Sequence, residues 1–568
     1  MDSNTFRRRL ITLGVVGASS SLACRPQDVV TTAASTTGRA THDVAPPRVT
    51  ARPEESTWRA IAADVPAFAG FYLDATGHII GLIADTSTSE ATALSGRIRQ
   101  AFDQQTPERR ATLLATPLQV RTVTYSFLSL AAWRDSVFYT LLGKMDGVVL
   151  DFIDVRANTI VVGIDASRGA VSPVIVMDRL RSLGIPETAV RIEENSAVVL
   201  YKTSPRRAAA ATMFSPNTNL RGEPSPLVAG YESWDVMMPN IYCSFGPTIT
   251  RNGQNGVTSA SHCTPTLFGL DNSTIDKAIE DQPYFLPVGT EARDSTNSCV
   301  CRKSEAAYFS VDGTVPFRRG AIAKTVDGLH PPHVWGDSGS LAIDQSDNFL
   351  SVLRYIDPNN AVIGDSIWKV GQRTGTTVGA LISTSADYVD ATETVRSQGL
   401  VDTYSDHGDS GAPLYKIDGT LFGMLVGGNQ SQHRTYFSWW TNVRAEIGGT
   451  INELTDITVS QPAETGSISF GNPKLTWSVQ VTNSTFPTYF TVDRELWNAT
   501  RQQFDDPERF VYGPTTATTF TDTTTVDLYY GSSKPTDDVS WAGYHVYANN
   551  HGVLSIGLWV YFRRGGRQ

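Results

Sequence analysis

The stretch that most constrains this chain is DHGDSGAPLY, at residues 406–415. Gly408 and Gly411 flank Ser410 and permit a sharp backbone turn that a residue with a Cβ would resist. Such a turn exposes the Ser410 hydroxyl and can direct the N–H groups of Gly408 and Ser410 at one point, as an oxyanion hole requires. The stretch therefore favours a serine nucleophile for acyl transfer. A second copy of GDSG occurs in WGDSGSLAI, at residues 335–343, so the partners of each copy must decide between them.

GDSG followed by a small residue and Pro resembles the nucleophile loop of chymotrypsin-like serine proteases. GVTSASHCT, at residues 256–264, resembles the T-A-A-H-C string of the same family, with Ser261 in place of the second Ala. The resemblance implies that Ser410 is the nucleophile, that His262 is its general base, and that Gly408 and Ser410 supply the oxyanion hole.

The acid departs from the family pattern. RKSEAAY, at residues 302–308, resembles the R-x-S-D-A-A string of the secreted bacterial α-lytic and streptogrisin-like branch, with Glu305 where Asp is usual. The resemblance implies that Glu305 orients His262, although its extra methylene moves the carboxylate by about 1.5 Å. Asp312 is the alternative acid. A further alternative is that Glu305 is a surface carboxylate and the domain is inactive.

The order His262, Glu305, Ser410 is the chymotrypsin order and selects the second GDSG copy. Only about thirty residues separate Glu305 from the first copy, too few to begin a second six-stranded barrel at ~5–6 residues per strand. KVGQRTGTTVG (369–379) also resembles the string that precedes the nucleophile loop in the secreted branch. GTLFGMLVGGN (419–429) predicts a buried strand ending at Gly427 and Gly428, where that family lays a substrate backbone. The first copy is most simply a turn.

The cysteine count fits an exported protein. With Cys24 set aside, four cysteines remain, and the family resemblance pairs Cys243 with Cys263. That disulfide would hold the base still and stabilise the fold by roughly 3 kcal/mol in the chain-entropy model. The pairing of Cys299 and Cys301 stays open. Neither spacing nor a nearby His supports a zinc site, and the expected chemistry needs no metal or cofactor.

Residues 1–24 predict an export signal, because a basic RRR start precedes a short apolar run that ends at Cys24. The run is too short to span a membrane at ~20 residues. RRRLI resembles a twin-arginine signal and SLAC resembles a lipoprotein box, so either Cys24 is lipid-attached or the signal is simply cleaved near Ala23. Residues 25–57, rich in Thr, Ala, Pro and Ser, predict a disordered linker. The net charge of −10 is spread along the chain and argues against nucleic-acid binding.

Residues 58–203 predict an α+β domain in the ferredoxin-like order β-α-β-β-α-β. AFAGFYLD, LAAWRD and NTIVVGID resemble the pro-regions of streptogrisin-like proteases. The resemblance implies a partner segment that helps a slow-folding all-β barrel to fold and that inhibits it while bound over the cleft. Residues 204–228, rich in Ala, Pro and Asn with three Arg, predict a flexible processing linker.

Residues 229–456 alternate strand-like runs with Gly and Asn turns and are expected to form the protease domain, an all-β double barrel. Residues 457–568 alternate apolar and polar positions with period two and predict an antiparallel β-sandwich, which could bind a surface ligand.

These observations together predict an exported serine endopeptidase that is made as a precursor and cleaves protein or peptide substrates. The alternative is a cell-surface binding protein with an inactive protease-like domain and a ligand-binding C-terminal β-sandwich.

Overall fold

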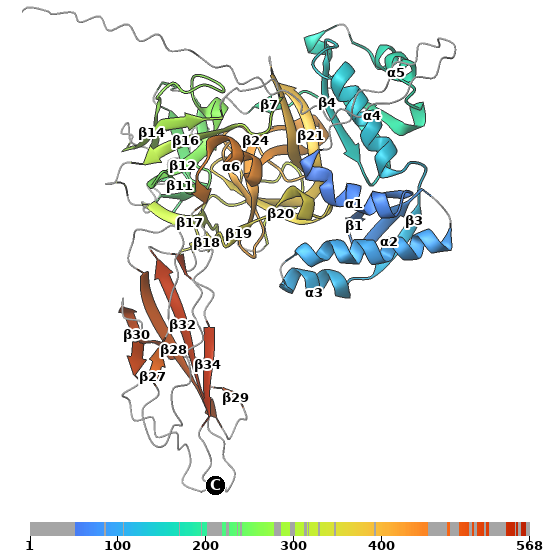
Figure 1. The fold of residues 1–568 in the computed structure, drawn as a ribbon. Helices are drawn as coiled ribbons and strands as arrows, with labels where there is room; N and C mark the ends of the chain where they lie inside the picture. The colour runs from blue at the N-terminus through green and yellow to red at the C-terminus, as the bar shows by residue number, and fades with distance from the viewer. Residues whose placement is uncertain are drawn as a thin grey trace, which may run out of the picture.

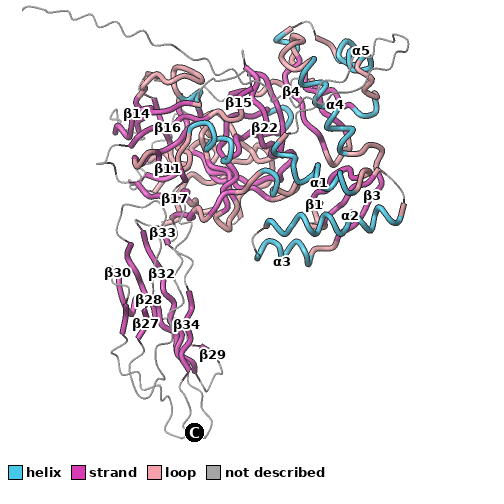
Figure 2. Tube along the Cα trace, viewed as in Figure 1, coloured by secondary structure: helices cyan, strands magenta, loops and turns pink. Residues whose placement is uncertain are grey.

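The computed structural model describes residues 52–451 with short gaps, and only the strand backbones beyond residue 451 (Figure 1; Figure 2). The gaps are residues 85–86, 106, 170, 195, 201–217, 223–226, 236, 239–240, 278–285, 296–300, 312–314, 316, 328–329, 346–347 and 391–392. The expected export signal with Cys24, the alternative acid Asp312 and Cys299 therefore lie outside the described residues. Among the helices that are described, none is long and apolar enough to cross a membrane.

The described chain begins with a 3-10 turn, η1 (Pro53–Glu55), that leads directly into α1 (Ser56–Asp64). The last residues of the expected linker, 25–57, therefore lie in η1 and the start of α1. Glu54 and Glu55 are buried, and their carboxylates are bonded to charged and hydroxyl partners. A polar composition that is typical of a linker gives no sign of that kind of burial.

An α/β region follows and contains the same arrangement in two copies: a helix, a β-hairpin, a helical crossover and a third strand parallel to the second. The first unit comprises α1, β1 (Phe68–Leu73), β2 (Ile79–Ile83), α2 (Thr88–Ala101), α3 (Pro107–Ala115) and β3 (Leu118–Thr122). The second unit comprises α4 (Phe127–Thr140), β4 (Val148–Asp154), β5 (Thr159–Ile164), α5 (Pro173–Ser182) and β6 (Val190–Glu193). One apolar core joins the units, with Trp58 against Phe68, Phe71 and Phe127.

The single ferredoxin-like sheet expected for this region was wrong. The six strands form two separate sheets, and β4 pairs with β21 (Gly375–Asp390) of the following region instead of with β1 or β3. Figure 1 shows β4 beside β21 at the boundary between the two regions. The sequence predicted strands in this region, but the local sequence does not specify which strands pair.

The strand-rich middle of the chain contains an open eight-stranded antiparallel sheet in the order β10-β9-β13-β14-β16-β12-β11-β26. Its strands are β9 (Glu232–Asp235), β10 (Tyr242–Ser244), β11 (Thr248–Arg251), β12 (Gln254–Ala260), β13 (Thr274–Lys277), β14 (Leu286–Asp294), β16 (Ala306–Val311) and β26 (Thr450–Ile451).

A second sheet closes on itself, because β21 pairs with both β20 and β22. The six strands of this barrel are β20 (Ser366–Gly371), β21, β22 (Glu393–Val401), β23 (Pro413–Tyr415), β24 (Thr420–Asn429) and β25 (Arg434–Trp439). Short strands also pair with members of the barrel: β7 (Val199–Leu200) and β19 (Arg354–Tyr355) with β24, and β15 (Cys301–Arg302) with β22. Helix α6 (Trp440–Ile447) follows β25. Val257 and Phe309 of the first sheet share one core with Leu421 and Met424 of the barrel.

A small three-stranded sheet, formed by β8 (Leu227–Ala229), β17 (Phe317–Ala323) and β18 (Phe349–Ser351), completes the middle region. Part of the expected processing linker, 204–228, is packed against this region. Leu220 is fully buried and donates its N–H to the Leu341 carbonyl. A single apolar residue among polar neighbours gives no periodic signal of burial.

Beyond residue 451 the described strands pair antiparallel, six in one sheet and two in another. They are β27 (Lys474–Thr476), β28 (Thr488–Asn498), β29 (Gln503–Phe504), β30 (Glu508–Thr515), β31 (Thr519–Thr521), β32 (Trp541–Asn550), β33 (Val553–Leu554) and β34 (Leu558–Arg563). The expected sandwich packing depends on side chains outside the described residues.

Candidate active site

The loop around Ser410 lies between β22 and β23 and turns on two glycines. Gly408 and Gly411 have φ of +108° and +88°, which only glycine adopts without strain. A Cβ on Gly411 would lie 2.2 Å from the Ser244 carbonyl oxygen. Ser244, on β10 of the first sheet, also donates its N–H to the Ser410 carbonyl at 2.7 Å. The glycines therefore let the Ser410 loop dock tightly against the first sheet.

Among the described residues, no atom accepts a hydrogen bond from the N–H groups of Gly408 and Ser410. These are the two groups expected from the sequence to form an oxyanion hole.

A buried ion pair between Lys369 and Asp409 fixes the loop. Asp409, next to Ser410, accepts the N–H groups of Arg373 and Thr374 at 3.0 and 3.1 Å and lies 3.2 Å from Lys369 Nζ. Both members of the pair are fully buried. Burial lowers the pKa of Lys369, and the nearby Asp409 carboxylate opposes that shift. The KVGQRTG string resembles a family motif but carries no sign of this structural role, because Lys369 and Asp409 lie 40 residues apart.

His262 lies in a 3-10 turn, η5 (Ser261–Cys263), at the end of β12. A disulfide joins Cys263 to Cys243 on β10, which is the pairing that the resemblance implied. The Ser261 hydroxyl donates to Asp294 at 2.7 Å and accepts the Phe268 N–H at 2.6 Å. The residues on both sides of His262 are therefore tied down, and its ring has a defined position.

His262, Glu305 and Ser410 meet in a buried contact. His262 Nε2 lies 2.8 Å from Ser410 Oγ, and His262 Nδ1 contacts Glu305 Oε1. The same carboxylate oxygen accepts the His262 main-chain N–H at 3.1 Å. A neutral imidazole with its proton on Nδ1 satisfies both ring contacts: it donates to Glu305 and accepts from the Ser410 hydroxyl. The three side chains come from both sheets, with Glu305 immediately before β16.

Glu305 uses only one of its two carboxylate oxygens in this contact. Its Oε2 atom is buried and has no hydrogen-bond partner among the described residues. The longer side chain thus reaches His262 through Oε1 alone.

The edge of β24 at Gly427 and Gly428 is occupied by the end of the α/β region. Strand β7 pairs antiparallel with it, Leu200 opposite Gly427 and Val199 opposite Gly428. A Cβ on Gly427 would lie 2.6 Å from the Val199 carbonyl oxygen. Val198 and Leu200 are buried, whereas Val199 is 46% exposed. The chain's own segment therefore lies where the sequence predicts a substrate backbone.

Two other sequence features resolve simply. The first GDSG copy forms a turn in which Asp337 N–H donates to the Val334 carbonyl, and Ser338 is exposed. Cys243, His262 and Cys263 cluster closely enough for metal ligands, but both sulfurs belong to the disulfide. That leaves one metal-binding atom in the cluster.

No protein-family model matches the chain, and no curated protein does. The chain is similar to several solved structures of chymotrypsin-like serine proteases, each over about two fifths of its length. Thermobifida fusca protease A is 15% identical with a TM-score of 0.27, covering 39% of this chain and 98% of that one. Nocardiopsis protease is 16% identical with a TM-score of 0.29, covering 40% and 98%. An α-lytic protease homolog, N4, is 16% identical with a TM-score of 0.28, covering 39% and 95%.

Proposed function

We propose that this protein is an exported serine endopeptidase that forms an acyl-enzyme through Ser410, His262 and Glu305. The observation that carries the proposal is the continuous contact from Ser410 Oγ through the His262 ring to Glu305. Beside it, the N–H groups of Gly408 and Ser410 have no acceptor among the described residues. That combination supplies a nucleophile, a base, a group that orients the base, and an oxyanion hole.

The chemistry follows from the geometry. Ser410 Oγ attacks the peptide carbonyl carbon while His262 Nε2 takes its proton. The N–H groups of Gly408 and Ser410 stabilise the developing oxyanion, each contributing about 3–4 kcal/mol. His262 then gives the proton to the leaving amine, and water hydrolyses the acyl-enzyme by the same steps in reverse. Glu305 keeps the Nδ1 proton in place and stabilises the imidazolium.

The substrate in this proposal is an extended peptide that adds a strand to β24. Main-chain hydrogen bonds to the strand give affinity, and alternate side chains face the enzyme. Gly427 and Gly428 allow the close approach that such pairing needs, as the fit of Val199 against Gly427 illustrates.

The α/β region, residues 58–203, acts in this proposal as an inhibitory and folding pro-region. Two contacts support the role: β7 covers the edge of β24, and β4 extends the barrel at β21. Processing would follow within the expected linker, upstream of the buried Leu220. Residues 1–24 would direct export, with Cys24 as the possible point of lipid attachment.

A fluorophosphonate probe tests the enzyme assignment. The secreted, processed protein should be labelled, and Ser410→Ala should abolish the labelling while leaving the fold intact. Ser338→Ala, in the first GDSG copy, is the matched control and should label normally. An unlabelled parent protein would favour the inactive surface-binding alternative.

A refolding experiment tests the pro-region separately. Residues 218–456 should yield more active enzyme in the presence of residues 52–203 than without them. Equal yields would remove the folding role and leave the endopeptidase assignment untouched.

A further inference from the structure

The segment that carries Glu305 is held by side chains from the second half of the middle region. The Glu305 N–H donates to the Ser438 hydroxyl on β25 at 3.1 Å. The N–H of Lys303 donates to the Glu446 carboxylate on α6 at 2.7 Å. The start of β16 is thus fixed against the barrel that also carries Ser410.

Gln398 of β22 joins these contacts and is fully buried. Its Nε2 atom donates to the Lys303 carbonyl at 2.8 Å and to the Arg396 carbonyl at 2.7 Å. Its Oε1 atom accepts from the Ser438 hydroxyl at 2.8 Å. Both N–H donors and the carbonyl oxygen of the amide are used, so its orientation is determined. We call residues 303–305 the acid segment. The Gln398 side chain therefore bonds both the main chain of this segment and the Ser438 hydroxyl, which accepts the Glu305 N–H.

A β-bulge directs Gln398 toward the acid segment. Ala386 pairs with Gln398 and Tyr388 with Val395, so two residues of β22 face the single Asp387 of β21. Bulges of this kind re-aim side chains and are frequent beside active sites. The bulge residue Ser397 has φ of +57°, a rare conformation for a residue other than glycine.

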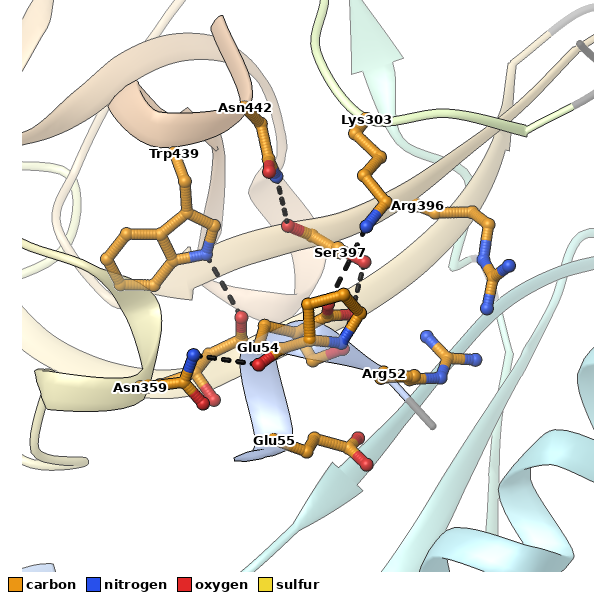
Figure 3. Close-up of polar contacts among 12 residues, drawn as sticks. Arg52, Glu54, Glu55, Lys303, Asn359, Arg396, Ser397, Trp439 and Asn442 are labelled. Carbon is orange, nitrogen blue, oxygen red and sulfur yellow. Dashed lines mark hydrogen bonds and ion pairs between the residues drawn. The ribbon is translucent and has the colours of Figure 1, made fainter. Parts of the chain in front are cut away.

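The bulge is held by partners on three sides, as Figure 3 shows for Glu54 and Asn442. The Ser397 N–H donates to Asp387 at 2.8 Å, and Asn442 Nδ2 donates to the Ser397 carbonyl at 3.3 Å. The Ser397 hydroxyl donates to Glu54 of the α/β region, whose other carboxylate oxygen lies 3.9 Å from Lys303 Nζ. The first turn of the α/β region therefore bridges the bulge and the acid segment.

We propose that Gln398 is a positioning residue for catalysis, which sets the point from which the Glu305 side chain starts. The role rests on the proposed function. Glu305 is anchored through one oxygen only, and its extra methylene adds a rotatable bond between main chain and carboxylate. A small shift of the Glu305 main chain therefore displaces Oε1 from His262 Nδ1, because Oε2 has no hydrogen bond among the described residues that would hold the carboxylate in place. Gln398, acting through Lys303 and Ser438, prevents that shift.

The test uses the secreted, processed protein and a fluorophosphonate probe, with kinact and KI measured between pH 5 and 9. Gln398→Ala should lower kinact by about 10-fold to 100-fold, because a misplacement near 1 Å can cost up to about 100-fold, and should leave KI unchanged. The pH at half-maximal kinact should also move. Asn442→Ala is the matched control, because it removes a bond to the same bulge but none to the acid segment; it should change none of the three.

A second variant and a coupling measurement keep the test decisive if Gln398→Ala folds poorly. Ser438→Ala removes the hydroxyl that joins Gln398 to the Glu305 N–H, and it should reproduce the kinact loss. Glu305→Asp, which withdraws the carboxylate, should cost a different factor in the Gln398→Ala protein than in the parent. Equal factors, or a kinact and pH profile that match Asn442→Ala, would overturn the positioning role. Labelling absent from the parent would instead overturn the proposed function on which it rests.

Discussion

The segment that covers the β24 edge makes a sharp prediction, because neighbouring valines differ in exposure. Val198 is 2% exposed and lies in an apolar cluster with Phe268, Tyr388 and Tyr436, whereas Val199 is 46% exposed. Val198→Asp should therefore release the segment from the β24 edge, and Val199→Asp should not. The two variants add the same charge to adjacent positions, so charge alone cannot distinguish them.

The magnitude follows from the burial of Val198. Fully burying a valine side chain contributes about 1.5–3 kcal/mol, and each 1.4 kcal/mol is a factor of ten. Val198→Asp should raise the fraction of molecules with an uncovered edge by at least about 10-fold, and up to about 150-fold. Val199→Asp should stay within about 0.5 kcal/mol of the parent, which is roughly twofold.

Hydrogen exchange of the full chain carrying Ser410→Ala, which blocks self-cleavage, measures this opening. Exchange of the amides in the part of β24 that pairs with β7, at Gly427 and Gly428, should accelerate in Val198→Asp by that factor and remain near the parent rate in Val199→Asp. Amides of β12, in the first sheet, serve as the internal reference. Equal acceleration in both variants would refute the assignment of Val198 as the residue that holds the segment.

Three further predictions concern the site and its support. Lys369→Met should lower the free energy of unfolding by about 3–5 kcal/mol, because it leaves the Asp409 charge buried without its partner; urea unfolding measures this, and Lys369→Met/Asp409→Asn should recover part of the loss. Burial raises the pKa of Asp294 to about 7, so the folded protein keeps a proton that the unfolded chain loses, and stability falls as pH rises from about 4 to about 7. Asp294→Asn removes that cost, so its advantage over the parent should grow by on the order of 4 kcal/mol between pH 4 and 8; a constant difference in unfolding free energy would contradict it. Glu305→Gln should slow fluorophosphonate labelling by up to ~10⁴-fold, because the base then adopts the wrong tautomer; an unchanged rate would move the acid elsewhere.

The motifs found much of the candidate site, and the reason is local chemistry. Gly408 and Gly411 are needed by a turn that no other residue adopts, so the sequence around Ser410 shows its conformation directly. His262 and Glu305 were found by resemblance of short strings, because no property of the intervening residues indicates that they meet. Gln398 carried no signal at all, since its role depends on a bulge created by pairing between β21 and β22.

The strands were easier to predict than their partners. The strand order expected for residues 58–203 rests on residues close in sequence, and β4 and β5 do pair across a short turn. The pairing of β4 with β21 joins residues more than 200 positions apart, and no local pattern specifies it. The burial of Glu54 was missed for the same reason, because its hydroxyl partners Ser385 and Ser397 lie far along the chain.

The β21–β22 hairpin connects the two roles proposed for the α/β region. Residues 386–388 of β21 pair with β22 on one side and with β4 on the other, so removal of the α/β region would leave one edge of β21 without its strand. Unpaired edges invite association with other chains, and they are most exposed while a non-local β fold is still forming. The same hairpin carries the Ser397 bulge, whose hydroxyl is bonded to Glu54. Docking of the α/β region thus covers the edge of β21 and fixes the Ser397 bulge at the same time. In a precursor with this docking complete, the acid segment would already be held in position. Processing would then uncover β24.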